Sequence, residues 1–135
     1  MVTKKVLKDK IEYRNEKGKL HRLDGPAVEY SDGSKFWYKN GQYHREDGPA
    51  IEWNDGDKEW YLNGLRHRLD GPAIEYSNGI KKWCINGQYH REDGPAVEWS
   101  DGTKSWYLND TGYSEQEWQD KVIKIKLQRL KSYGN

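Results

Sequence analysis

The sequence predicts a mostly β fold: a single elongated antiparallel sheet of stacked 23-residue β-hairpins that ends in a C-terminal capping α-helix. Three observations predict it: an internal repeat, two turn signals in every repeat, and alternating apolar and polar residues between the turns. A fixed period of this length is typical of proteins that stack one small unit. Histidines, prolines and tryptophans recur in steps of 23 residues: His21, His44, His67 and His90; Pro26, Pro49, Pro72 and Pro95; Trp37, Trp60, Trp83 and Trp106.

Both turn signals favour β-hairpins, because Asn-Gly and Asp-Gly accept the positive φ angles of tight turns. Between the turns, Val28 and Tyr30 share one face of an expected strand, whereas Ala27 and Glu29 share the other. This period of two predicts two strands in each unit. The first signal is the tripeptide SDG, NDG, SNG or SDG that ends at Gly33, Gly56, Gly79 and Gly102. The second is Asn40-Gly41, Asn63-Gly64, Asn86-Gly87 and, in altered form, Asn109-Asp110.

The repeats define three segments of the chain. Residues 21–113 hold four repeats, and residues 1–20 form an N-terminal cap segment that enters the pattern in degraded form. There Gly18 keeps the register of Gly41, but no tryptophan precedes it. Residues 114–133 form the expected amphipathic helix.

Capping residues support this helix. Ser114 is a suitable N-cap, Glu117 occupies the capping-box position, and Tyr113 can pack on Trp118. We expect the helix to cover the open end of the sheet. A second apolar edge leaves self-association or partner binding through the helix as the alternative; it comprises Ile123, Leu127 and Leu130.

A weaker period of 46 residues overlies the first. Leu23 and Leu69 alternate with Glu46 and Glu92, and Tyr30 and Tyr76 alternate with Trp53 and Trp99. Duplication of a two-unit block would produce this pattern, and so would successive units that face different surroundings.

Composition points to a thin structure. Only 33% of residues are hydrophobic, but seven Trp and ten Tyr exclude a disordered chain. The single cysteine, Cys84, excludes an internal disulfide, and we expect a buried strand residue rather than a catalytic thiol. Residues 21–113 carry 11 basic and 16 acidic side chains, which disfavours nucleic acid along the repeats.

The ends of the sequence bear on location. The N-terminus has no apolar run after its lysines, so it does not resemble a secretory signal. No stretch approaches the roughly 18 apolar residues of a membrane helix. We therefore expect a cytoplasmic protein.

The pattern Tyr/Trp–x–Asn–Gly–x–x–His–x–x–x–Gly–x–Ala–x–x–aromatic–x–x–Gly resembles the MORN repeat family, best over residues 37–59 and 60–82. The longer segment "HREDGPA" and its copies, each of which we call a joint, replace the usual His-Gly-x-Gly and indicate a variant class. This variant also resembles tandem "HRxDGPA" reading frames of large bacteriophages and, more loosely, MORN-variant repeats of bacterial proteins labelled antitoxins. The resemblance implies stacked hairpins that serve assembly, scaffolding or membrane adaptation, in the host cytoplasm for a phage protein.

The His, Arg and Asp of each joint raise the question of whether the joints are catalytic or metal-binding sites. No Ser or Cys recurs at a fixed offset from each of the four histidines, and neighbouring histidines two strands apart lie too far apart to share a zinc ion. We therefore expect no catalysis, no metal ion and no cofactor, and a structural role for His21, Asp24, His44, Asp47, His67, Asp70, His90 and Asp93. The Asp would cap the turn, the Arg would pair with an Asp, and the His would pack on a Trp and bond to a backbone carbonyl.

The expected function is therefore non-enzymatic binding of another macromolecule, a protein in the first place. By the phage resemblance, this would be inhibition of a host defence or regulatory protein. A self-assembling scaffold is one alternative, and an aromatic ladder that binds a small ligand, nucleic acid or a membrane surface is another. Positions that differ between otherwise identical units are the expected contacts: Leu23, Tyr43, Glu46, Arg66, Leu69, Tyr89 and Glu92.

Overall fold

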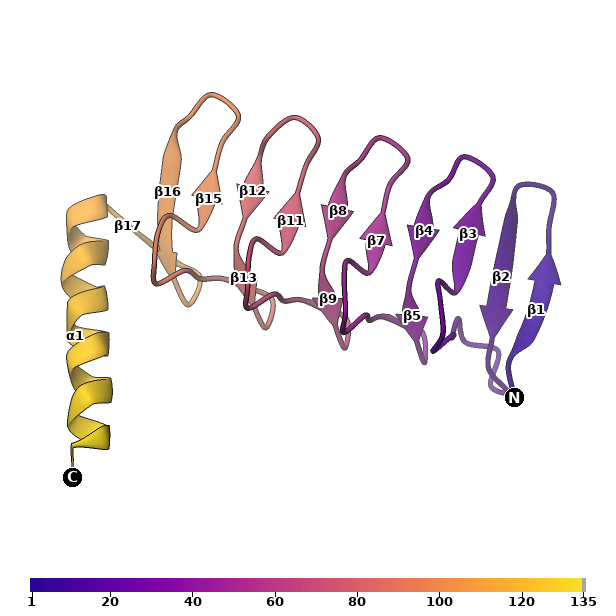
Figure 1. Ribbon diagram of the computed structural model, residues 1–135, viewed down its shortest axis with the longest axis horizontal. Helices are drawn as coiled ribbons and strands as arrows, with labels where there is room; N and C mark the ends of the chain where they lie inside the picture. Colours follow the sequence, from indigo (N-terminus) through magenta and orange to yellow (C-terminus); the bar gives the residue numbers. More distant parts are fainter. Residues whose placement is uncertain (135) are drawn as a thin grey trace.

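The computed structural model describes residues 1–134 and contains one 11-stranded antiparallel sheet followed by one helix (Figure 1). Consecutive hairpins stand side by side in a long row, and the helix lies at the C-terminal end. The predicted fold, a single long sheet of stacked hairpins with a C-terminal helix, is confirmed. The strand order in the sheet is β1-β2-β3-β4-β7-β8-β11-β12-β15-β16-β17.

The first three units contribute four short strands each rather than the expected two, and the last unit contributes three. The strands of the long sheet are β1 (Thr3–Val6), β2 (Lys10–Arg14), β3 (Val28–Tyr30), β4 (Lys35–Phe36), β7 (Ile51–Glu52), β8 (Lys58–Glu59), β11 (Ile74–Glu75), β12 (Lys81–Lys82), β15 (Val97–Glu98), β16 (Lys104–Leu108) and β17 (Thr111–Tyr113). The Asn-Gly turns close separate two-stranded sheets: β5 (Tyr38–Lys39) with β6 (Gln42–Tyr43), β9 (Tyr61–Leu62) with β10 (Leu65–Arg66), and β13 (Cys84–Ile85) with β14 (Gln88–Tyr89). Trp37, between β4 and β5, donates its backbone N–H to the Ala50 carbonyl of the next unit (2.7 Å).

The Asn-Gly turns have the backbone that the sequence predicts. Asn40 and Gly41 both adopt positive φ angles, 50° and 82°, as the type I′ turn of a two-residue hairpin requires. Asn109 and Asp110 adopt 47° and 71°, so the altered last copy keeps the same turn without glycine.

The two faces of the sheet differ in character. On one face lie the buried aliphatic side chains of the strands, with Val28, Phe36 and Ile51 forming a core cluster that Tyr38 and Tyr43 help to cover. The other face, which we call the joint face, carries the joints. There the register places acidic and basic residues opposite one another in an unbroken row across the strands: Glu29, Lys35, Glu52, Lys58, Glu75, Lys81, Glu98 and Lys104. Opposite charges at facing positions stabilise pairing between strands.

The N-terminal segment contains a fifth hairpin. Strand β1 pairs with β2, and β2 pairs with β3, so residues 3–14 continue the row. Tyr13 takes the place of the missing tryptophan, since the Arg22 guanidinium lies 4.0 Å from its ring centroid. The degraded copy therefore still supplies an aromatic ring on which the arginine of the first joint stacks.

Helix α1 (Glu115–Tyr133) begins as the sequence predicts: the Ser114 hydroxyl accepts a hydrogen bond from the Glu117 backbone N–H (3.2 Å). Its buried residues, Trp118 and Val122, pack with Leu108 of the last hairpin. The Trp118 indole also donates to the Arg91 carbonyl (2.9 Å). Within residues 1–134, no helix is long and apolar enough to span a membrane.

We predict that Trp118→Ala costs about 3–5 kcal/mol of unfolding free energy, because it removes a large buried side chain and leaves a cavity beside Trp106. Chemical denaturation followed by circular dichroism measures the loss. Leu127→Ala, on the exposed side of the same helix, is the matched control and should change stability little. Equal losses in the two variants would contradict this packing.

Candidate interaction surface

The joint is organised around its arginine. The Arg45 guanidinium donates to the Asp47 carboxylate (3.1 Å), the Pro49 carbonyl (3.0 Å) and the Glu52 carboxylate (3.3 Å). Its Cζ also lies 3.9 Å from the centroid of the Trp37 ring. Charge-assisted bonds and a cation–π contact thus meet on one side chain. Arg22, Arg68 and Arg91 make the same three hydrogen bonds in their own joints.

The arginine also explains the glycine of each joint. A Cβ added to Gly48 would lie 3.0 Å from the Arg45 Cζ, and one added to Gly94 would lie 2.7 Å from the Arg91 Cζ. The guanidinium therefore lies between an aromatic ring and a glycine where an added Cβ would force the guanidinium to shift. The predicted Arg–Asp pair is confirmed within one joint, whereas the residue that packs on the tryptophan is arginine and not the expected histidine.

The histidines link successive units, through a different bond from the one expected. His44 Nδ1 accepts from the Asn63 backbone N–H of the next turn (2.9 Å), instead of donating to a carbonyl. An accepting Nδ1 places the proton of the neutral ring on Nε2. Each histidine makes this bond to the asparagine 19 residues ahead: His21 to Asn40, His44 to Asn63, His67 to Asn86, and His90 to Asn109.

These contacts engage one ring nitrogen of each joint histidine and one carboxylate oxygen of each joint aspartate. The Nδ1 atoms are occupied by backbone amides, and the carboxylates of Asp24, Asp47, Asp70 and Asp93 accept from arginine. In the described part of the chain, no three His, Cys, Asp or Glu side chains are grouped as a metal site would need. Burial raises the pKa of Cys84 to about 11, so its thiol is a poor nucleophile at neutral pH.

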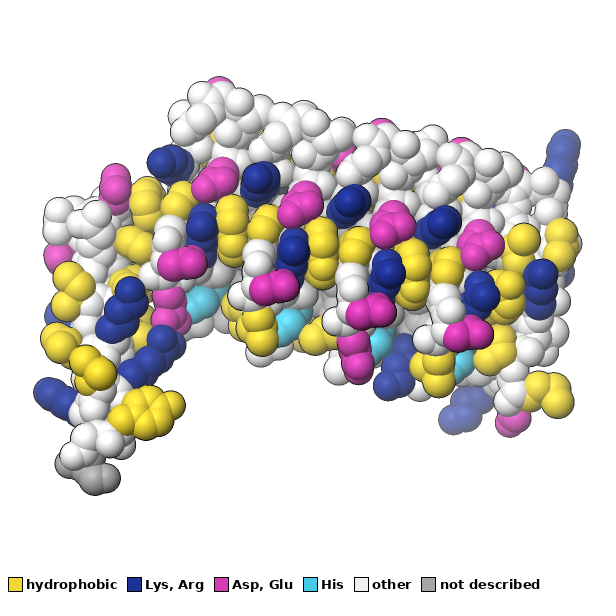
Figure 2. Space-filling view, viewed as in Figure 1, with side chains coloured by type: hydrophobic (Ala, Val, Ile, Leu, Met, Phe, Trp, Pro, Cys, Tyr) yellow, Lys and Arg dark blue, Asp and Glu magenta, His cyan; other side chains and the backbone are white. Residues whose placement is uncertain are grey.

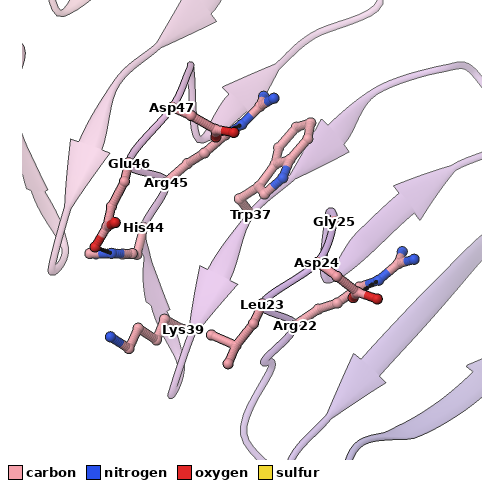
Figure 3. A pocket seen from close by; sticks show the side chains of 10 residues that line it. All are labelled: Arg22, Leu23, Asp24, Gly25, Trp37, Lys39, His44, Arg45, Glu46 and Asp47. Carbon is pink, nitrogen blue, oxygen red and sulfur yellow. Dashed lines mark hydrogen bonds and ion pairs between the residues drawn. The ribbon is translucent and has the colours of Figure 1, made fainter.

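Three hollows lie in a row between successive joints on the joint face, with volumes of 560, 510 and 560 Å³. Trp37, Trp60 and Trp83 line one hollow each, and the joint residues form the walls. Figure 2 shows the same order on the surface: basic, acidic and hydrophobic side chains alternate along the row, with the histidines beneath them. Figure 3 shows the first hollow, with Leu23 on one wall and Glu46 on the other.

Four of the seven predicted contact residues lie in the walls of these hollows. Leu23 and Leu69 are 76% and 81% exposed, which is high for leucine, and the Glu46 side chain is 81% exposed. Glu92 is different, because its side chain is only 23% exposed. The structure therefore brings Leu23, Glu46, Leu69 and Glu92 together on one face.

The other three predicted contacts, Tyr43, Arg66 and Tyr89, line none of the hollows. The Tyr43 ring packs on Tyr61, with centroids 5.1 Å apart, and Arg66 donates to the Tyr61 hydroxyl (3.1 Å). Tyr89 packs on Tyr107 (5.3 Å). These side chains vary between units but contact neighbours within the protein.

Glu92 is covered by the C-terminal helix. Arg129 donates to both of its carboxylate oxygens (2.5 and 2.9 Å), and His90 Nε2 lies 2.9 Å from Glu92 Oε2. The hydrogen bond from Arg129, followed by that from His90, lowers the pKa of Glu92. Sequence reasoning missed Arg129, since nothing in a helical pattern tells which distant carboxylate a surface arginine reaches.

No protein-family model, no curated protein and no solved structure matches this chain.

We predict that Arg68→Lys lowers the unfolding free energy by about 1–3 kcal/mol, although it keeps the charge, because lysine cannot stack flat on Trp60 and donate in three directions. Thermal and chemical denaturation measure the change. Arg66→Lys is the control, since Arg66 is more exposed and its Cζ lies farther from an aromatic ring, 5.9 Å from the Tyr61 centroid. A loss in Arg66→Lys as large as in Arg68→Lys would refute the stacking argument.

A second prediction concerns the histidine bond. In His67→Asn, the side-chain oxygen can take the place of Nδ1 and accept from the Asn86 N–H, whereas His67→Leu leaves that N–H without its acceptor. We expect His67→Leu to cost about 1 kcal/mol and His67→Asn to cost clearly less. Hydrogen exchange at the Asn86 amide checks the assignment directly: protection should fall in the leucine variant alone.

Proposed function

We propose that this protein is a non-enzymatic binding module whose joint face recognises another protein. Supporting this, the residues of the joint that resemble catalytic or metal-binding groups are occupied by bonds within the protein, as described for Arg45 and His44. The walls of the hollows meanwhile present apolar side chains to solvent. Aromatic and arginine side chains beside exposed leucines are typical of protein interfaces.

The observation that carries this proposal is the exposure of Leu23 and Leu69 at equivalent positions of the first and third joints. The two leucines lie in walls of hollows in one row, so one partner can contact both. The resemblance to bacteriophage reading frames makes a host defence or regulatory protein the first class of partner to test.

Photo-crosslinking tests the proposal. A benzophenone amino acid placed at Leu69 should form an adduct with one discrete protein in a lysate of the natural host. Excess unlabelled protein should suppress that adduct, whereas excess Leu23→Asp/Leu69→Asp protein should not.

The control probe is placed at Leu130, which is 67% exposed but lies on the helix and not on the joint face. The absence of an adduct at Leu69, or the same adducts from Leu69 and Leu130, would argue against binding through the joint face.

A further inference from the structure

The first and third hollows are two copies of one site, 46 residues apart. Nine of the ten lining residues of the first hollow recur unchanged in the third, and the exception is Lys39, which Ile85 replaces. Leu23 corresponds to Leu69, and Glu46 corresponds to Glu92. The weak 46-residue period of the sequence thus appears in space as a repeated site.

In the third hollow this site is already engaged by a helix. Lys126 of α1 contributes to the lining, and Arg129 binds both oxygens of Glu92. Residues three positions apart lie on neighbouring parts of one helix face, so Lys126 and Arg129 lie on the same side of α1. Trp118 fixes the helix from the same side through the Arg91 carbonyl.

In the first hollow the corresponding glutamate is open to solvent. His44 Nε2 lies 3.5 Å from Glu46 Oε1, as His90 lies near Glu92, and Figure 3 shows this pair. Among residues 1–134, no lysine or arginine nitrogen lies within 4.0 Å of the Glu46 carboxylate. The protein thus contains the same His–Glu pair twice, once bound by a helix and once free.

We propose that Glu46 and the first hollow bind a helical segment of a partner protein that carries a lysine and an arginine three residues apart, as α1 does at Glu92. This inference rests on the proposed function and specifies the chemistry of the partner. The guanidinium would bind the Glu46 carboxylate through two parallel hydrogen bonds. An aliphatic residue of the segment would contact Leu23.

The intact α1 of a second copy is a poor candidate for this partner. Its Arg129 is engaged at its own Glu92, and its Trp118 and Val122 are buried against its own last hairpin. Binding in trans would require these contacts to break. A separate protein with a basic helix has no such cost.

Lys39 supplies a specificity element. At this position of the third hollow the residue is Ile85, so the first hollow adds a positive charge that the intramolecular site lacks. A helix identical to α1 should therefore bind the first hollow less tightly than a helix with an acidic or neutral residue over Lys39.

The test uses the full chain and a synthetic peptide of residues 114–133, held helical by a lactam bridge between Asp120 and Lys124, away from Lys126 and Arg129. Nuclear magnetic resonance titration should show saturable shifts of the His44 ring signals. Glu46→Gln should weaken binding about three- to tenfold, and a peptide with Lys126→Gln and Arg129→Gln should bind as poorly. Lys39→Ile should strengthen binding.

Glu16→Gln is the matched control, because the Glu16 side chain is also 81% exposed but pairs with the N-terminal ammonium (3.1 Å) rather than with a histidine, and it should leave binding unchanged. The inference is wrong if Glu46→Gln and Glu16→Gln behave alike, if the ring signals of all four histidines shift equally, or if only His90 responds because the peptide displaces α1.

The two proposals can fail separately. If the Leu69 adduct forms and competes as expected but Glu46→Gln changes neither peptide binding nor the adduct, the joint face binds a partner of other chemistry. If the peptide binds at Glu46 and no adduct forms, the site exists but the crosslinking proposal for Leu69 fails.

Discussion

The joint arginine is the constraint on which the rest of this structure depends. A thin sheet has no deep interior, so the long loop that connects one hairpin to the next needs its own fixed point. In the second joint the Arg45 guanidinium provides it by stacking on Trp37, between β4 and β5, while bonding to Asp47, the Pro49 carbonyl and Glu52 of the following strand. The same guanidinium favours glycine three residues later in the joint, since an added Cβ there would force the guanidinium to shift.

Contacts between units have a second, regular layer. Each Asn-Gly turn donates from its asparagine N–H to the histidine of the preceding unit, and from the next N–H to a carbonyl just before that histidine, as Gly64 does to Tyr43 (2.9 Å). Each unit is therefore bonded mainly to its two neighbours. In such arrays stability is close to a sum of unit and interface contributions.

Much of the fold could be predicted from the sequence because the period is long and the turn chemistry is local. Asn40-Gly41 specifies its hairpin without tertiary information, and Ser114 specifies the helix start. The sequence does not predict that the first three units are divided at their tryptophan into a long-sheet and a short-sheet hairpin, since alternation continues through the tryptophan. The expectation that the histidine packs on Trp37 is also wrong, because Arg45 packs there. His44 and Arg45 are adjacent in the sequence, and the sequence alone does not tell which of the two side chains contacts the indole.

The candidate surface was predicted in part. The variation at Leu23 and Glu46 pointed to exposed positions, whereas the same variation at Tyr43 and Arg66 reflects adjustment to internal neighbours. The ends of the sheet also differ: α1 packs beside β17, while β1 has a partner on one side only and carries Lys4 and Lys5. The outer backbone groups of β1 thus lie open at the N-terminal end of the row, and the lysines on this strand are charges of the kind that discourage another chain from adding to a sheet edge.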